Sequence, residues 1–132
     1  MSESDPKTNP KRPGLLLVDH GTRLASANER FHAFAARVAA ERPDWHVRAA
    51  HMELAEPGFT AGSDILVADG ASEIHIHLHF LGSGFHVRKS IPALVAEARD
   101  RHPGVEISVS DPLGEDPRLL DLILARMDAR KK

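Results

Sequence analysis

Four short stretches of the chain have the apolar pattern of β-strands. Residues 14–18 (GLLLV) form a continuous apolar run, which is typical of a strand buried on both faces. Residues 73–81 (EIHIHLHFL) alternate between polar and apolar side chains, as a half-buried strand does. The other two predicted strands are weaker and cover residues 45–52 and 105–109.

Helical spacing follows each predicted strand. Apolar residues at intervals of three and four predict helices that end near Arg42 and before Pro103, and a weaker helix covers about 59–69. Asp116 and Pro117 predict the start of a last helix. The inward positions expected for this helix are Leu120, Ile123, Leu124 and Met127.

The order β-α, repeated four times, predicts the fold. Such alternation requires right-handed crossovers and gives a parallel sheet covered by helices. We therefore expect one three-layer, flavodoxin-like α/β domain with a four-stranded parallel sheet over residues 14–130. Residues 1–13 lack apolar periodicity and are expected to be a flexible N-terminal tail.

Composition narrows the class of protein. The 132 residues suit one domain, and no apolar run approaches the roughly 18 residues that cross a bilayer. The first residues lack the apolar stretch of a signal peptide, so we expect a cytoplasmic protein with no membrane partner. The absence of cysteine excludes disulfides and thiolate metal sites. A formal charge of −2 predicts no nucleic-acid partner.

Nine histidines stand out, because average usage supplies about three in a chain of this length. Histidine titrates near neutral pH and is the commonest metal ligand. In a parallel α/β sheet, ligands bind beyond the carboxyl ends of the strands. The residues that follow the four predicted strands at that edge are His20, Glu53, His86 and Asp111.

Each of these residues also has a structural interpretation. His20 precedes Gly21 and could simply order a turn, Glu53 could be a loop carboxylate, and Asp111 before Pro112 is more typical of a turn former. Taken as a site, two neutral imidazoles and a carboxylate suit Co²⁺, Ni²⁺, Fe²⁺ or Zn²⁺ and also suit proton removal near neutral pH. Insertion of a divalent metal into a macrocycle needs both functions, because two N–H protons leave as the metal enters.

Three motifs, in this order, resemble those of the short sirohydrochlorin chelatases. Residues 18–23 (VDHGTR) resemble the V-G-H-G-S-R opening of that family, and residues 52–57 (MELAEP) resemble its L-E-x-x-x-P segment. Residues 80–92 (FLGSGFHVRKSIP) resemble its F-L-x-x-G-x-H-x…I-P segment. The resemblance runs from about residue 14 to 127 and so covers nearly the whole chain.

The resemblance implies a class II chelatase, a lyase that inserts Co²⁺, or in some branches Ni²⁺ or Fe²⁺, into sirohydrochlorin for cobalamin, siroheme or coenzyme F430 synthesis. The family's two active-site histidines correspond to His20 and His86, as catalytic residues and metal ligands, and its acidic partner corresponds to Glu53. The metal is then a substrate, and no permanently bound cofactor is expected. Short relatives build their cleft from two copies, so the resemblance also implies a homodimer.

Sirohydrochlorin carries many carboxylates, so basic side chains are expected at the rim of the cleft. Arg23, Arg88 and Lys89 lie beside the two histidine loops, and Gly84 would let a ligand approach the backbone. The alternative for the basic residues is ordinary solvated surface charge.

The sequence departs from the family pattern at three positions. Asp19 stands where the family commonly has glycine, Leu78 where it often has proline, and Ser90 where an acid usually precedes Ile-Pro. None of these removes a catalytic histidine, but they leave the choice of metal open. A non-catalytic metal-binding or tetrapyrrole-carrier protein with the same fold is therefore the alternative function.

Three further histidines, His75, His77 and His79, alternate along one predicted strand and so share one of its faces. We favour a polar strand face beneath a helix, with a secondary metal site and a dimer interface as alternatives. His79 lies nearest the carboxyl edge and is the one of the three expected to reach the cleft, where Glu53 and His79 are candidates for additional metal ligands. No role is predicted for His32, His46, His51 and His102.

Overall fold

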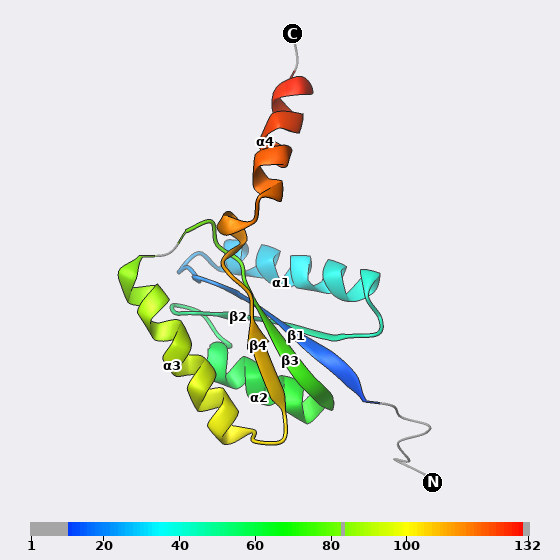
Figure 1. Ribbon diagram of the computed structural model, residues 1–132, viewed down its shortest axis with the longest axis vertical. Helices are drawn as coiled ribbons and strands as arrows, with labels where there is room; N and C mark the ends of the chain where they lie inside the picture. Colours follow the sequence, from blue (N-terminus) through cyan, green and yellow to red (C-terminus); the bar gives the residue numbers. More distant parts are fainter. Residues whose placement is uncertain (1–10, 83, 131–132) are drawn as a thin grey trace.

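The computed structural model describes residues 11–82 and 84–130, without the side chains of Phe85 and His86. Its strands form one parallel sheet in the order β2-β1-β3-β4 (Figure 1). The strands are β1 (Arg12–Asp19), β2 (His46–His51), β3 (Ala71–Leu78) and β4 (Glu106–Val109). The predicted α/β fold with a four-stranded parallel sheet is confirmed.

Helices cover the two faces of the sheet unequally. Helix α1 (Ala25–Glu41) lies on one face, and α2 (Phe59–Asp69) and α3 (Phe85–Arg101) lie on the other (Figure 1). On the α1 face, Phe31 and Ala35 pack against strand residues that include Leu17 and Ala49. The larger core lies on the opposite face and contains Leu16, Val18, Leu66, Ile74, Ile76 and Val95.

Several element boundaries differ from the prediction. Strand β1 begins at Arg12, while residues 1–10 of the expected tail lie outside the described residues. Strand β3 ends at Leu78 rather than near residue 81. Helix α3 begins at Phe85, so His86 lies in its first turn and not in a glycine loop. The N-cap residue is Gly84, so the helix starts without a side-chain cap.

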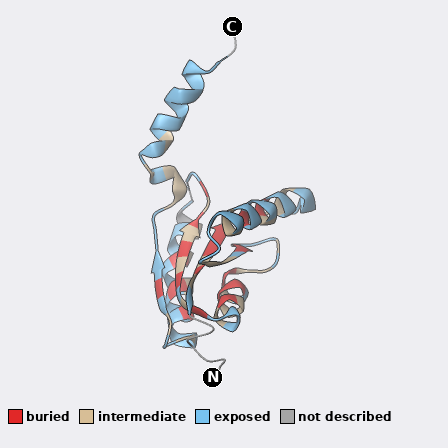
Figure 2. Cartoon of the chain, turned by 90° about the vertical axis from the view of Figure 1, so that its right-hand side faces the viewer, coloured by how far each residue is buried: buried red, intermediate tan, exposed pale blue. Residues whose placement is uncertain are grey.

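The last helix, α4 (Arg118–Asp128), points away from the sheet (Figures 1 and 2). Asp116 Oδ1 accepts a hydrogen bond from the Arg118 backbone N–H at 2.8 Å, as a helix cap does. The expectation that the apolar side of α4 turns inward is wrong for this chain alone. Every residue of α4 is at least partly exposed, and the four expected inward residues are 46–61% exposed: Leu120, Ile123, Leu124 and Met127.

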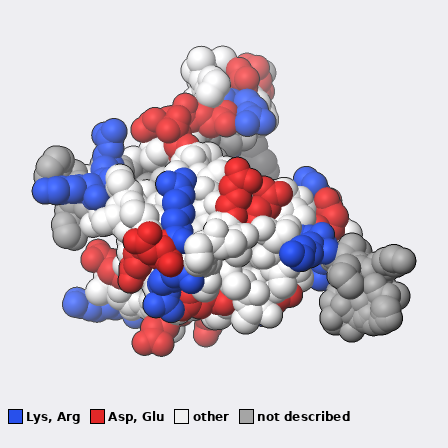
Figure 3. Space-filling view, turned by 60° about the horizontal axis from the view of Figure 1, so that its bottom comes forward, with Lys and Arg blue, Asp and Glu red and all other residues white. Residues whose placement is uncertain are grey.

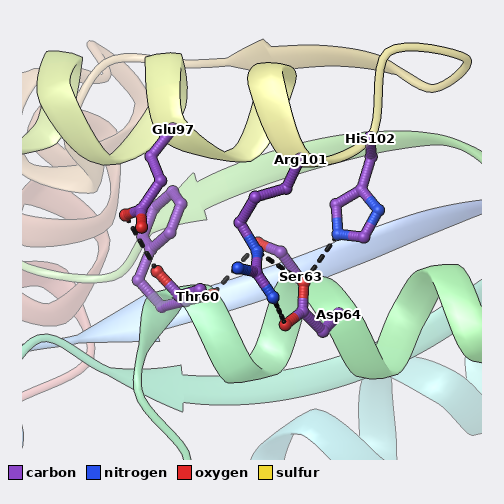
Figure 4. A network of polar contacts seen from close by, with 7 residues as sticks. Thr60, Ser63, Asp64, Glu97, Arg101 and His102 are labelled. Carbon is purple, nitrogen blue, oxygen red and sulfur yellow. Dashed lines mark hydrogen bonds and ion pairs between the residues drawn. The ribbon is translucent and has the colours of Figure 1, made fainter.

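A cluster of polar contacts joins α2 to the end of α3 (Figure 4). Asp64 accepts hydrogen bonds from the Arg101 guanidinium and, at 2.6 Å, from His102 Nε2. The Arg101 hydrogen bond holds the pKa of the Asp64 carboxyl below its usual range, with a further contribution from His102. His102 lies where the chain turns from α3 toward β4. The cluster therefore stabilises the packing of α2 and α3 near the amino ends of the strands, opposite the predicted site.

Across the described ranges, none of the helices combines the length and hydropathy of a bilayer span. Figure 3 shows acidic and basic side chains interspersed on one face of the molecule. This distribution agrees with the formal charge of −2.

Candidate functional site

The loops that follow β1 and β2 run side by side beyond the carboxyl end of the sheet. The Met52 backbone N–H donates to Asp19 O at 2.8 Å, and the Glu53 N–H donates to His20 O at 3.1 Å. The backbone pairing of β1 and β2 therefore continues one step past the strands. Two of the predicted site residues, His20 and Glu53, are brought together by this pairing.

Gly21 makes the close approach of the two loops possible. Its φ of +86° lies in the left-handed region that side chains disfavour. A Cβ atom at this position would lie 1.9 Å from the carbonyl oxygen of Glu53. Leu54, directly after Glu53, adopts a φ of +69°, which is unusual for a residue with a side chain. Unfavourable backbone conformations of this kind concentrate at functional sites.

The His20 ring is held on the α2–α3 face of the sheet. It lies over the ring of Phe80, with 4.5 Å between the centroids, and its Nε2 is 3.4 Å from the Gly82 carbonyl oxygen. In the tautomer that donates to this oxygen, Nδ1 carries the free lone pair. The contact links the His20 turn to the glycine-containing segment that leads into α3.

Glu53 is exposed and lines a pocket of about 370 Å³ between its loop and α3. The other lining residues are Met52, Val87, Ser90, Ala93 and Leu94. The pocket thus has a mainly apolar wall and one carboxylate, which suits a flat organic ligand with a polar edge.

Asp111 follows β4 and lines a different pocket, and the other predicted site residues belong to the start of α3 and to the His20 turn. Gly84 directly precedes α3, its carbonyl oxygen accepts a hydrogen bond from the Arg88 N–H at 3.1 Å, and open space surrounds the position of its absent side chain. The Arg23 and Arg88 side chains are exposed. The His86 side chain lies outside the described residues, so its position relative to His20 and Glu53 stays a prediction.

Sequence reasoning missed a hydrogen-bonded chain of three side chains. His51 is completely buried, its Nδ1 lies 2.6 Å from Asp19 Oδ1, and its Nε2 lies 2.9 Å from Nε2 of His32 on α1. Burial, and then the charge of His51, lowers the pKa of His32. The unusual Asp19 was the one signal in the sequence, since a carboxylate that replaces glycine beside a buried strand end needs a partner.

The histidine face of β3 is only partly covered by a helix. The rings of Phe31 and Phe34 on α1 each lie 5.2 Å from the His79 ring, whereas the His75 Nδ1 bonds to Ser108 Oγ of β4 at 2.8 Å. His77 Nε2 and His79 Nδ1 are 3.0 Å apart. The three rings take part in hydrogen bonds on this face, and the ring contacts with α1 are those of His79.

Burial lowers the pKa of His77, and the neighbouring His79 and His75 lower it further. Burial also lowers the pKa of His79, although Asp19 acts in the opposite direction. Both rings are therefore neutral near pH 7, the form in which imidazole binds a metal.

Among the side chains that the structure describes, which do not include that of His86, no three His, Asp or Glu residues converge as a ready metal site. His79 lies on the α1 face, whereas His20 packs against Phe80 on the opposite face. His20 and His79 therefore lie on opposite faces of the sheet, and a role of His79 among the metal ligands stays a prediction.

A comparison with protein-family models identifies the family of the chain. The sequence model of the CbiX family matches residues 14–130. The chain belongs to the CbiX family. The family predicted from the three motifs is thereby confirmed.

The relatives of this CbiX chain are named as chelatases of two different metals, iron and cobalt. It is 32% identical to the chloroplastic sirohydrochlorin ferrochelatase of Arabidopsis thaliana, over 86% of this chain and 51% of the relative. It is 29% identical to the sirohydrochlorin cobaltochelatase of Methanosarcina barkeri, over 86% of this chain and 93% of the relative. The chain thus spans about half the length of the first relative and nearly all of the second.

A solved structure shares the fold of this CbiX chain. The sirohydrochlorin chelatase SirB from Bacillus subtilis subspecies spizizenii, in complex with cobalt, superimposes with a TM-score of 0.74 at 28% identity. The superposition covers 89% of this chain and 50% of SirB.

Proposed function

We propose that this CbiX chain is a sirohydrochlorin chelatase that inserts a divalent metal into the tetrapyrrole. The observation that carries the proposal is the pairing of the His20 and Glu53 loops beside the start of α3, within a family match over residues 14–130. These are the positions at which the family motifs hold their histidines and their acid.

Metal insertion into a tetrapyrrole requires groups that bind a metal and groups that accept protons. The metal replaces two N–H protons of the macrocycle, so two protons must leave for each metal ion that enters. We assign metal binding to His20 and His86, proton acceptance to these histidines, and charge balance and proton transfer to Glu53. Neutral imidazole can perform both tasks in turn, because loss of the metal frees the same nitrogen for a proton.

We propose that Arg23, Gly84 and Arg88 hold the substrate. Arginine binds carboxylates through two parallel hydrogen bonds, and sirohydrochlorin carries several carboxylates around its rim. The exposed Arg23 and Arg88 side chains are free of the core, and the open space at Gly84 admits a ligand to the backbone. No permanently bound cofactor is required, because the metal is itself a substrate.

Co²⁺ is the metal that we propose as preferred, ahead of Ni²⁺ and Fe²⁺. The support is the cobaltochelatase relative, which this chain covers over 93% of its length. The pathway would then be cobalamin synthesis, in the cytoplasm.

The direct test mixes the purified protein with sirohydrochlorin and Co²⁺, Ni²⁺ or Fe²⁺ without oxygen and follows the absorption change of the macrocycle. We expect acceleration over the protein-free reaction, fastest with Co²⁺. No acceleration with any metal would overturn the proposal. Stoichiometric binding of metal or tetrapyrrole without turnover would support the non-catalytic carrier instead.

Variants of the two histidines test their assignment. His20→Ala and His86→Ala should each lower the rate of insertion at least about 100-fold, the usual contribution of a proton-transfer residue. His46→Gln is the matched control, because His46 begins β2 at the opposite end of the sheet. Unfolding curves should show all three variants folded. Full activity of His20→Ala or His86→Ala would remove that residue from the mechanism.

A further inference from the structure

A pocket beside His77 shares no lining residue with the Glu53 pocket described above. It has a volume of about 460 Å³ and is formed by β3, the end of β4 and the segment that leads into α4. His77 contributes the one imidazole, and Asp111 and Glu115 contribute carboxylates to the wall. Arg118 also lines the pocket, but it is paired with Asp116 through hydrogen bonds of 2.8 and 3.0 Å.

His77 presents its Nε2 to the neighbouring His79, whose Nδ1 lies 3.0 Å away. Two nitrogens that each lie about 2.1 Å from one metal ion are separated by about 3.0 Å at a right angle and about 3.4 Å at the tetrahedral angle. The hydrogen-bonded spacing of 3.0 Å therefore also matches that of two adjacent ligands of one metal, which would replace the hydrogen bond.

Nothing in the proposed insertion chemistry uses this pair. His77 and His79 face the α1 side of the sheet, while His20 packs on Phe80 on the other side. The pair is not fully buried, so water can reach it and complete the coordination. The carboxylates of Asp111 and Glu115 favour a cation in the adjoining pocket.

We propose that His77 Nε2 and His79 Nδ1 bind a divalent first-row transition metal ion at a second site, on the α1 face of the sheet. Water supplies the remaining ligands, because no third His, Asp or Glu of the described residues converges on the pair. Both rings are neutral before and after binding. The ring that donated the 3.0 Å hydrogen bond keeps its proton by moving it, through solvent, to its other nitrogen.

The test measures metal binding alone, without tetrapyrrole, so it stands apart from the proposed chelatase activity. The full chain with His20→Ala and His86→Ala is freed of metal and titrated with Zn²⁺, Co²⁺ and Ni²⁺ in a calorimeter. We expect one bound ion per chain. Adding His77→Gln should weaken binding at least about tenfold. Adding His75→Gln should leave it unchanged, because His75 bonds to Ser108 on the same face.

Absence of binding in the His20→Ala/His86→Ala chain, or equal weakening by His75→Gln and His77→Gln, would overturn the proposal. Nitrogen NMR of the unsubstituted protein decides the case if His77→Gln does not fold. Zn²⁺ should then shift the resonances of His77 Nε2 and His79 Nδ1, and unchanged resonances would also overturn it.

Discussion

Gly21 is the residue at which the two loops of the proposed site touch. Any side chain there would have to adopt an unfavourable positive φ and displace the Glu53 carbonyl. We expect Gly21→Ala to lower the free energy of unfolding by about 2–3 kcal/mol and to lower chelatase activity, because His20 and Glu53 would shift. Urea denaturation and the insertion assay measure the two effects.

Gly104→Ala is the matched control for this substitution. Gly104 lies in the turn before β4, and a Cβ atom there would meet no atom within 4 Å. It should leave both stability and activity close to those of the unsubstituted protein. Equal effects of the two substitutions would show that the contact of Gly21 with Glu53 has no special importance.

At the residue scale, sequence could place His20 and Glu53 at the carboxyl edge of the sheet but could not give the partners of the other histidines. His20 and Glu53 follow strands, and the position after a strand places a residue at the carboxyl edge whatever the details of packing. His51 pairs with Asp19 and His32, which are 32 and 19 residues away along the chain. The Asp19 pair depends on the register of β1 against β2, and the His32 contact arises only when α1 packs on the sheet, so no local periodicity relates these positions.

At the scale of the elements, Asp64 on α2 bonds to Arg101 and His102 at the end of α3. These contacts join the two helices at the end of the sheet away from the site. We expect Asp64→Ala to lower Tm by about 3–6 °C, the effect of losing ~1 kcal/mol in a domain of this size. Activity at 25 °C should not change. Calorimetry and the insertion assay check both statements, and a loss of activity in a folded Asp64→Ala protein would contradict this separation.

The elements themselves were largely predictable, and the packing of the last one was not. The apolar runs and helical spacings depend on local sequence, so all four strands and all four helices were located to within a few residues. The apolar spacing of α4 was also correct. Its partner could not be predicted, because an amphipathic helix shows that a surface is covered without showing which chain covers it.

At the scale of the whole molecule, the notable feature is the exposed apolar side of α4. Its exposed side carries Leu120, Ile123, Leu124 and Met127, which would be costly to leave in water. We propose that α4 packs against a second copy of the chain and forms a homodimer. Analytical ultracentrifugation should give twice the mass of one chain. Ile123→Lys combined with Met127→Lys should give monomers, and Ala125→Lys on the opposite side of the helix should not. A monomeric unsubstituted protein would refute this dimer.

Stability of the whole molecule should depend on the neutral state of its histidines. Burial is the first cause that lowers the pKa values of His32, His46, His77 and His79. Between their ordinary pKa near 6.5 and their lower folded pKa values, the unfolded chain binds more protons than the folded chain. The free energy of unfolding is therefore highest above about pH 6.5 and falls as the pH decreases toward 5.

Urea denaturation at a series of pH values measures this slope. The paired Asp44, Asp64 and Asp116 carboxyls, whose pKa values are also lowered, lose their contribution only below about pH 4, so they do not obscure it. His77→Gln should reduce the slope between pH 7 and 5. Stability that increases toward pH 5 would contradict the assignment.

The contacts of Asp64 with Arg101 and His102 have a consequence for how such a chain diversifies. They secure one edge of the sheet, while His20, Glu53 and the start of α3 occupy the other. In the proposed chelatase, substitutions in the loops at the carboxyl ends of the strands would leave the contacts of Asp64 with Arg101 and His102 untouched. The choice of metal could therefore change while the chain stays folded.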